Sequence, residues 1–302
     1  MGVLDCIGNT PLVKLDVLNP NPEVEIFVKL EGNNPGGSIK DRPALYMVLA
    51  AERAGELTRD KIILEATSGN TGIGLAMVAT AKKYRVKLTM PACVSVERRK
   101  VLEAFGAELI LSPAEEGTDG AIRLAHKIMA ENPDLYFMPN QFDNHANILA
   151  HYETTGKEII EQTKGSITHF VAGIGTSGTI MGAGKRLKEY NSAIKIIGVE
   201  PVMGHRIQGL KNMSESIVPK IFNPACMDER HIINDEEAFD TTRMLAVKEG
   251  LFMGMSSGAA MHIAIKKSSE LESGVIVVIF PDRGDRYLST ALFTSVCGKC
   301  PP

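Results

Sequence analysis

One lysine occupies an unusual place in the sequence. In the stretch NNPGGSIKDRP, residues 33–43, two glycines and Ser38 precede Lys40, and an amphipathic segment follows. Ser38 and Asp41, three residues apart, fit a capping box, so we expect a helix to begin here. The positive end of a helix dipole disfavours an ammonium group, which makes a neutral, nucleophilic amine accessible at Lys40. An isolated lysine is more often a solvated surface charge, so the stretch alone leaves both interpretations open.

A second segment has the composition of an anion-binding turn. In EATSGNTGIG, residues 65–74, the side chains of Thr67, Ser68, Asn70 and Thr71 stand between a strand-like run and a helical one. Hydroxyl and amide groups beside backbone N–H groups at a helix start suit a carboxylate. Ordinary N-caps use the same residue types, so this motif also has two interpretations.

A third segment, GIGTSGTIMGAG at residues 173–184, matches the glycine pattern of a dinucleotide-binding turn. It follows a strand-like run, it precedes a helical one, and Glu200 ends the next strand-like run. In a dinucleotide fold, such an acid binds the ribose. A nicotinamide-dependent oxidoreductase is therefore one hypothesis.

The hydroxyl groups of the same segment favour a different ligand. Thr176, Ser177 and Thr179 crowd the turn, whereas a dinucleotide pyrophosphate is approached mainly by bare backbone. Hydroxyls combined with N–H groups suit the dianion of a terminal phosphate monoester. Ser256 lies in a further Ser/Gly turn, GMSSGAA at residues 254–260, which taken alone is typical of an N-cap.

The elements that must position these residues alternate regularly along the chain. Short apolar runs separated by amphipathic stretches indicate βαβ units and a largely parallel sheet. The predicted strands are residues 24–30, 61–66, 86–91, 107–112, 168–173, 194–200 and 275–281. The predicted helices are residues 42–56, 72–84, 96–106, 120–132, 179–190 and 259–268.

The composition of the chain restricts the class of protein to which it can belong. The chain has 302 residues, 44% of them hydrophobic, and a net charge of −3, which is typical of a globular protein large enough for two domains. It has no basic block for nucleic acid or an anionic membrane, no secretory signal and no metal-ligand spacing, so we expect a cytoplasmic protein without a metal. Cys297 and Cys300 lie in residues 294–302, which we interpret as a flexible tail.

Taken together, these motifs resemble the cysteine synthase family of fold-type II pyridoxal-phosphate enzymes, most closely the cysteine synthase B type. The resemblance runs from about residue 3 to residue 293 and rests on motifs that match in order: IGNTPLVKL, LEGNNPGGSIKDR, EATSGNTGIGLA, ERRKVLEAFGAEL, GTSGT, SSGAA and DRGDRYLSTALF. It implies an α/β fold of two open, mostly parallel twisted sheets flanked by helices, as in the tryptophan synthase β subunit. It also implies a smaller mobile lobe, 41–145, and a larger phosphate-binding lobe, 1–40 plus 146–302.

The resemblance also implies a role for each candidate residue. Lys40 would carry the cofactor, pyridoxal 5′-phosphate, as an aldimine and act as the catalytic base. Asn70 would bind the ring hydroxyl, and Ser256 would face the pyridine nitrogen. The phosphate would be held by Gly175, Thr176, Ser177, Gly178 and Thr179, and the substrate carboxylate by Thr67, Ser68, Thr71 and Gln141.

The implied reaction is β-replacement on an O-activated L-serine, through an α-aminoacrylate, with sulfide or another thiol, giving L-cysteine. Cystathionine β-synthase, lanthionine synthase and cysteine desulfhydrase share this chemistry and stay open as alternatives. A non-catalytic protein on this fold is expected to lack the lysine, and Lys40 is present.

Residues 204–213, GHRIQGLKNM, bear on the donor and on partners. They are similar to the A type, in which this region meets serine acetyltransferase, and the family resemblance implies a homodimer. Arg206 and Lys211 are either surface charges or cations for the phosphate of an O-phosphoserine donor.

Overall fold

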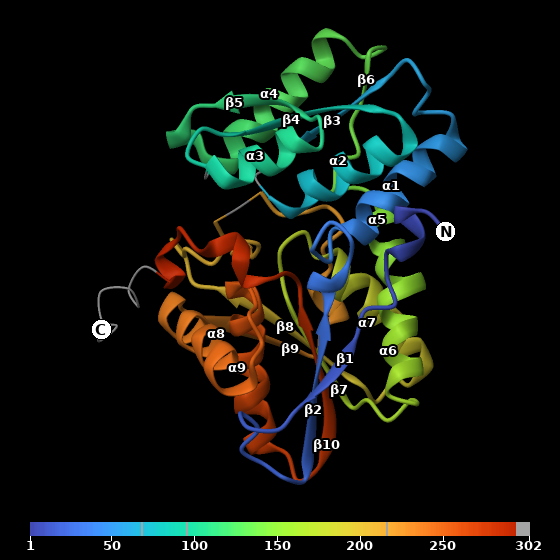
Figure 1. Cartoon of the computed structure of the whole chain (residues 1–302). Coiled ribbons are helices and arrows are strands. Elements are labelled where there is room, and N and C mark those ends of the chain that lie inside the picture. The colour runs from blue at the N-terminus through green and yellow to red at the C-terminus, as the bar shows by residue number, and fades with distance from the viewer. Residues whose placement is uncertain (68, 95, 216, 294–302) are drawn as a thin grey trace. The chain divides into compact units, whose positions relative to one another are not determined.

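The computed structural model describes residues 1–67, 69–94, 96–215 and 217–293 (Figure 1). The chain divides into two compact units, each with its own sheet. Unit 1 consists of Met1–Ile7 and Asn34–Ala150, and unit 2 of Gly8–Asn33 and the residues from His151 onward. The predicted tail with Cys297 and Cys300 lies outside the described residues, as does Ser68.

Unit 1 is built on a parallel sheet with the strand order β5-β4-β3-β6. Its strands are β3 (Ile62–Ala66), β4 (Arg85–Pro91), β5 (Glu108–Ser112) and β6 (Tyr136–Phe137). Its helices are α1 (Asp41–Ala54), α2 (Asn70–Lys82), α3 (Val96–Ala104), α4 (Gly117–Glu131) and α5 (His145–Ala150), with short 3₁₀ turns η1 (Val3–Cys6) and η3 (Ala114–Glu116).

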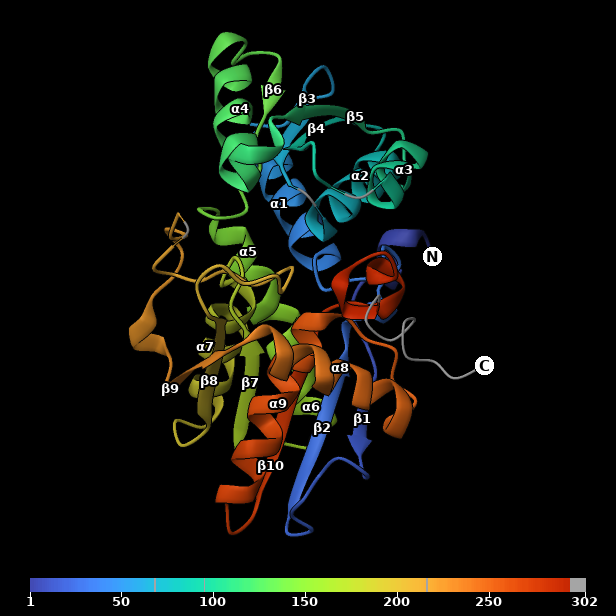
Figure 2. The same ribbon diagram turned by 90° about the vertical axis from the view of Figure 1, so that its left-hand side faces the viewer.

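Helices cover both faces of this sheet, as a parallel sheet requires (Figure 2). Side chains alternate along a strand, so neighbouring residues of β3 enter different cores. Ile63 packs in the cluster that includes residues of α1, α2 and α3, and Leu64 in the cluster with α4. Every residue of β3 is buried, which fits the apolar run that predicted it.

Unit 2 is built on a larger sheet with the strand order β1-β2-β10-β7-β8-β9, in which β1 alone runs antiparallel to its neighbour. Its strands are β1 (Leu12–Leu15), β2 (Val24–Leu30), β7 (His169–Gly173), β8 (Lys195–Pro201), β9 (Glu229–Ile233) and β10 (Gly274–Phe280). Its helices are α6 (Gly156–Gln162), α7 (Gly178–Tyr190), α8 (Asp235–Glu249) and α9 (Met255–Glu270), with a π-helix η4 (His151–Thr155) and 3₁₀ turns η2 (Glu31–Asn33), η5 (Pro224–Cys226) and η6 (Gly284–Tyr287).

The helices of unit 2 also divide between the two faces of the sheet. Ile197 on β8 belongs to the core cluster shared with α8 and α9. A β-carbon added at Gly184 of α7 would lie 3.2 Å from Cγ2 of Ile196, the adjacent residue of β8. Because adjacent strand residues point to opposite faces, α7 covers the face that α8 and α9 leave open (Figures 1 and 2).

A buried lysine ties α6 to β2. The side chain of Lys29 is fully buried, and its Nζ forms an ion pair of 2.7 Å with Glu158 Oε2. It also donates hydrogen bonds to the Thr10 carbonyl (2.7 Å) and to Gln162 Oε1 (2.9 Å). A buried charge is tolerated only with such compensation, so removing either partner of the pair is destabilising.

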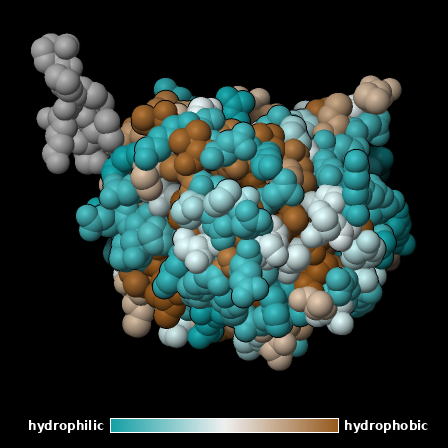
Figure 3. Space-filling view, turned by 90° about the horizontal axis from the view of Figure 1, so that it is seen from below, coloured by the Kyte–Doolittle hydropathy of each residue, from teal (hydrophilic) through white to brown (hydrophobic). Residues whose placement is uncertain are grey.

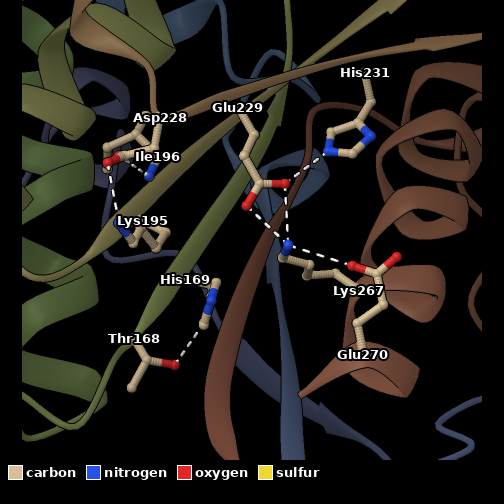
Figure 4. Close-up of polar contacts among 9 residues, drawn as sticks. All are labelled: Thr168, His169, Lys195, Ile196, Asp228, Glu229, His231, Lys267 and Glu270. Carbon is tan, nitrogen blue, oxygen red and sulfur yellow. Dashed lines mark hydrogen bonds and ion pairs between the residues drawn. The ribbon is translucent and has the colours of Figure 1, made fainter.

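A surface network of charges lies where β8 and β9 begin (Figure 4). Lys267 of α9 pairs with Glu229 Oε1 at 2.8 Å and with Glu270 at 3.3 Å, and His231 lies 2.9 Å from Glu229 Oε2. Burial opposes ionisation of Glu229, but the hydrogen bonds from Lys267 and His231 outweigh it and lower the pKa of Glu229. This network is at the ends of the strands opposite to the Gly-rich turn after β7, so we interpret it as structural.

The predicted fold class is confirmed, and each predicted strand and helix is found within a few residues of its expected bounds. The sequence did not predict the short strands β1, β6 and β9 or the helices α5, α6 and α8. Among the described residues, no helix is long and apolar enough to cross a membrane. The face in Figure 3 carries mainly hydrophilic residues, with apolar ones scattered between them.

Candidate active site

Lys40 immediately precedes the first residue of α1. It is the N-cap, with φ −73° and ψ −13°, so it lies at the positive end of the helix dipole. The capping box expected from Ser38 and Asp41 is wrong. Ser38 Oγ accepts a hydrogen bond from the N–H of Lys40 (3.2 Å), and Asp41 Oδ2 accepts one from the N–H of Gly36 (2.5 Å). The two side chains therefore fix the loop before the helix instead of capping it.

The start of α1 packs closely against α2 through a glycine. A β-carbon at Gly74 would lie 3.0 Å from the carbonyl oxygen of Lys40 and 3.1 Å from Cβ of Ala44. Asn70 is one helical turn before Gly74 and shares its face of α2. The backbone of Lys40 is thus brought beside the first turn of α2.

The turn between β3 and α2 brings together residues predicted to bind a carboxylate. Thr67 and Thr71 are both buried, and Thr67 Oγ1 accepts a hydrogen bond from the N–H of Gly69 (3.3 Å). Thr71 Oγ1 donates a hydrogen bond of 2.6 Å to Oε1 of Gln141, a residue 70 positions further along the chain. The fold of unit 1 therefore joins Thr71 and Gln141 into one polar cluster.

Glu65 supports this cluster, and the sequence analysis did not single it out. Its buried carboxylate accepts hydrogen bonds from the backbone N–H groups of Asn140 (2.7 Å) and Gln141 (3.3 Å). Burial raises the pKa of Glu65 to about 7, although these two hydrogen bonds favour the ionised form. An acidic residue inside the apolar run KIILEA was the available signal.

In unit 2, the predicted phosphate turn joins β7 to α7. Ser177 adopts a left-handed conformation, with φ 69°, at the N-cap of α7. A β-carbon at Gly175 would overlap the carbonyl oxygen of Gly209, so this position requires glycine. Ser177 Oγ is buried and has no hydrogen-bond partner within the described part of the chain. A buried hydroxyl at a helix N-terminus without a partner is suited to an anionic ligand.

Ser256 lies near the same turn. It is buried in the first turn of α9, which follows the N-cap Gly254. A β-carbon at Gly209 would lie 3.9 Å from Ser256 Oγ. Gly209 therefore approaches both the turn at Gly175 and Ser256, and it brings the two predicted cofactor contacts of unit 2 together.

A buried histidine positions the last hydroxyl of the phosphate turn. His151, on the π-helix η4, has Nε2 3.3 Å from Thr179 Oγ1 and Nδ1 3.0 Å from Thr155 Oγ1. His151 has no local signal in the sequence, because its partner Thr179 is 28 positions away. Short π-helical segments inside helices are frequent at functional sites.

Two alternative assignments lose support from the geometry. Glu200, the acid proposed for a ribose, is 2% exposed, and its Oε1 accepts a hydrogen bond from the N–H of Met213 (3.2 Å). Arg206, considered for a donor phosphate, forms an ion pair of 3.0 Å with Asp235. In the described ranges, no group of three acidic, histidine or cysteine side chains could hold a metal ion.

A match to a family model identifies the class of protein. The family model described as "Pyridoxal-phosphate dependent enzyme" matches residues 3–282. The buried Ser177 hydroxyl and the glycine-dependent turn after β7 fit the phosphate of this cofactor.

The individual relatives then define the family. The chain is 51% identical to the cysteine synthase of Aquifex aeolicus over 300 residues, covering 97% of this chain and 92% of that protein. It is 47% identical to cysteine synthase B of Pseudomonas aeruginosa, covering 96% and 97%. Its structure matches that of the cysteine synthase of Entamoeba histolytica with a TM-score of 0.92 at 40% identity, covering 97% and 90%. The chain belongs to the cysteine synthase family of pyridoxal-phosphate dependent enzymes.

Proposed function

We propose that this protein is a pyridoxal-phosphate dependent cysteine synthase that replaces the activated hydroxyl of an L-serine derivative with sulfide or another thiol. O-acetylserine is the expected donor and O-phosphoserine the alternative. The observation that carries the proposal is the position of Lys40, at the start of α1 and packed against the first turn of α2. Similarity to cysteine synthases over almost the whole chain supports it.

The proposed contacts follow the two units. In unit 1, Lys40 anchors the cofactor, Asn70 binds its ring hydroxyl, and Thr67, Ser68, Thr71 and Gln141 bind the substrate carboxylate. In unit 2, Ser256 faces the pyridine nitrogen, and Gly175, Thr176, Ser177, Gly178 and Thr179 bind the phosphate.

Lys40 also moves the protons of the reaction. Bound pyridoxal phosphate supplies an electron sink for the charge that develops at the substrate Cα. As a neutral amine, Lys40 Nζ would take the proton from the substrate Cα as general base. Ser256 offers a neutral hydroxyl to the ring nitrogen, which limits the electron sink and favours prompt loss of the β-substituent over transamination. Once the thiol has added, the same amine would return a proton to Cα.

The test is the visible absorption of the purified protein, combined with product analysis. We expect wild type to bind pyridoxal phosphate with visible absorption and to convert O-acetylserine and sulfide into cysteine. Lys40→Ala should lose both the lysine-dependent absorption and turnover, while Lys127→Ala, an exposed lysine on α4, should lose neither. A colourless wild-type protein, or full turnover in Lys40→Ala, would contradict the proposal.

A panel of substrates separates the related activities. O-phosphoserine tests the donor, homocysteine as acceptor tests cystathionine formation, and cysteine alone tests sulfide release and lanthionine formation. Arg206 is paired with Asp235, and we expect O-acetylserine to be preferred. Equal rates with both donors would contradict this preference. The role of Lys211 is tested by comparing both donors in wild type and Lys211→Ala, where equal losses with both donors would exclude a contact with the donor phosphate.

We also propose that the enzyme is a cytoplasmic homodimer and that residues 41–145 move as a lobe when substrate binds. If the enzyme forms a complex with serine acetyltransferase, we expect residues 204–213 to make the contact. The family resemblance supports these assignments. Light scattering of the protein alone and with serine acetyltransferase tests the two assemblies. Disulfide cross-links between the lobe and the rest of the chain should slow turnover if the lobe moves.

A further inference from the structure

Glu65 is a carboxylate inside the core of unit 1. It is 2% exposed, it lies on the central strand β3, and its register partner on β4 is Leu88. Burying a carboxylate costs free energy unless the group receives hydrogen bonds in return. We therefore expect the buried carboxylate of Glu65, in an otherwise apolar strand, to have a function that offsets this free-energy cost.

The compensation comes from two successive backbone groups. The N–H of Asn140 donates to Oε2 at 2.7 Å, and the N–H of Gln141 donates to Oε1 at 3.3 Å. Each carboxylate oxygen of Glu65 thus accepts a hydrogen bond from one residue of the Asn140–Gln141 turn. Successive backbone N–H groups commonly form an anion-binding concavity, and here the anion is a side chain of the protein itself.

The turn that Glu65 holds has a conformation that needs support. Asn140 has φ 51°, in the left-handed region that is unfavourable for residues other than glycine, although asparagine tolerates it better than most. Its side chain donates a hydrogen bond to Asp143 Oδ2 (3.1 Å), and its carbonyl accepts one from the N–H of Asp143 (3.0 Å). Without Glu65, the two N–H groups would lose their buried acceptor.

Hydrogen bonds from neighbouring residues fix both the backbone and the side chain of Gln141 in this turn. The carbonyl of Gln141 accepts a hydrogen bond from Asn147 Nδ2 (2.8 Å), and its Oε1 accepts one from Thr71 Oγ1 (2.6 Å). Because Oε1 is engaged as an acceptor, the side-chain amide has N–H donors to present to an anion. Glu65 is also only two residues before Thr67, so the same strand end carries both the support and the first residue of the carboxylate turn.

We propose that Glu65 is a positioning residue, whose buried carboxylate fixes the Asn140–Gln141 turn beside Thr71 and so preorganises the groups that bind the substrate carboxylate. This role rests on the proposed function, because Thr71 and Gln141 are taken there as ligands of the substrate. Glu65 itself touches neither substrate nor cofactor and acts through Gln141.

Glu65→Gln is the informative substitution because it keeps the size of the side chain. Glutamine can accept from one backbone N–H, but its NH₂ group opposes the other. At pH 8, where Glu65 is mostly ionised, we expect KM for O-acetylserine to rise about tenfold or more, because a hydrogen bond to a charged group is lost. The kcat and the affinity for pyridoxal phosphate should change little. An unchanged KM, or a loss confined to kcat, would overturn the proposal.

Thr89→Val is the matched control for a general loss of stability. Thr89 is fully buried on β4 of the same sheet, and its hydroxyl donates a hydrogen bond of 2.8 Å to the carbonyl of Ala121. The substitution removes a buried hydrogen bond of unit 1 without touching the Asn140–Gln141 turn. We expect KM to stay at the wild-type value; a rise equal to that of Glu65→Gln would mean that Glu65 is merely structural.

A double-mutant cycle tests whether Glu65 acts through Gln141. Gln141→Ala should raise KM by itself, and adding Glu65→Gln should then raise KM less than about twofold further, because coupled residues are not additive. Multiplied effects of the two substitutions would overturn the proposal. If Gln141→Ala leaves KM unchanged, the carboxylate site assigned under the proposed function is wrong.

Amide hydrogen exchange decides the positioning role independently of catalysis. In the wild-type holoenzyme, the amides of Asn140 and Gln141 should exchange slowly. In Glu65→Gln they should exchange about a hundredfold faster, while Thr89→Val leaves them slow. Unprotected amides in wild type, or unchanged exchange in Glu65→Gln, would overturn the proposal. The wild-type measurement applies even if the variant does not fold.

Discussion

The buried hydroxyl of Ser177 destabilises the folded chain, but it is suited to bind an anionic ligand. A buried hydroxyl without a hydrogen-bond partner destabilises a protein by about 1–3 kcal/mol. The described residues provide no partner for Ser177 Oγ, and the residue is also left-handed. Such a hydroxyl can donate a hydrogen bond to a phosphate. Binding of that ligand would recover the free energy that is lost when the hydroxyl is buried unpaired.

We therefore expect Ser177→Ala to separate stability from affinity. The unfolding midpoint of the apoprotein in urea should stay the same or rise, while the Kd for pyridoxal phosphate, measured by fluorescence titration, should rise about tenfold to a hundredfold. Ser112→Ala is the control, because Ser112 Oγ in unit 1 is likewise buried without a described partner. An unchanged Kd in Ser177→Ala would contradict the assignment.

Glu65 makes stability depend on pH in a defined direction. Its pKa is raised from 4.5 to about 7 by burial, so the folded protein binds this proton more tightly than the unfolded chain does. The contribution of Glu65 to the free energy of unfolding therefore falls as pH rises from about 4.5 to 7, by on the order of 3 kcal/mol.

The urea midpoints of wild-type and Glu65→Gln apoprotein, compared between pH 5 and pH 8, test this direction. The other titrating groups are common to both proteins and cancel in the comparison. Wild type should be favoured more at pH 5 than at pH 8. A difference that stays constant with pH would mean that Glu65 keeps an ordinary pKa, and one that grows in favour of wild type as pH rises would mean that folding lowers its pKa; either result contradicts the expected direction.

At the scale of elements, the candidate site residues of each unit lie at helix starts reached by short turns. The starts of α1 and α2 pack together through Gly74, and the turn before α7 packs against Gly209. Both approaches bring backbone close to backbone: a β-carbon would be tight at Gly74, and at Gly175 it would overlap the Gly209 carbonyl, so Gly175 must be glycine. The helix starts supply N–H groups and a positive dipole end to an anion.

Gly175→Ala should disrupt one of these approaches. Its methyl group would overlap the Gly209 carbonyl, so either the phosphate turn or the segment at Gly209 must move. We expect the affinity for pyridoxal phosphate to fall about a hundredfold and stability to fall by about 1–3 kcal/mol. In Gly184→Ala, on the helix α7 that follows this turn, the added carbon would lie 3.2 Å from Cγ2 of Ile196, a side-chain atom and not a backbone atom of the turn, so cofactor affinity should be retained. Equal effects of the two substitutions would contradict this expectation.

The elements that were predictable from sequence are those with a strong local signal. Buried parallel strands such as β10 appear as continuous apolar runs, since both faces are covered. Strand β9 was missed because three of the five residues in its sequence, ERHII, are polar and only Ile233 is buried, so it has no apolar run. Helix α8 was missed although Asn234 and Glu237 form a capping box at its start.

The residues of the candidate site likewise include some with a local sequence signal and some that only the fold brings together. Lys40, Asn70 and the hydroxyls of residues 175–179 stand in turns whose composition is visible locally, and the family resemblance added their roles. Glu65 and His151 depend on Asn140, Gln141 and Thr179, which only the fold brings near. No local pattern contains that information.

At the scale of the whole molecule, the two units divide the sequence unevenly. The chain passes between them after Ile7, after Asn33 and after Ala150. The sheet of unit 1 is complete with β6, whereas in unit 2 the strand β10 joins β2 on one side to β7 on the other. Unit 2 therefore depends on the C-terminal part of the chain, and unit 1 does not.

Removal of residues 271–302 should affect the two sheets differently. Without β10, the β1–β2 pair has no link to β7, β8 and β9, so the sheet of unit 2 should be lost. We expect hydrogen-exchange protection to disappear from the amides of β7 and to persist in those of β3. Loss of protection to the same extent in both strands would indicate that the units fold as one cooperative body.

The central position of β10 also has a consequence for synthesis on the ribosome. The strand β2, with the largely apolar sequence VEIFVKL, is made early, but its parallel neighbour is made almost last. Until then, one edge of β2 presents unpaired backbone groups, and such edges recruit other chains. The nascent protein must therefore protect an early strand through most of its own translation, which makes the rate of elongation and the supply of chaperones determinants of its yield.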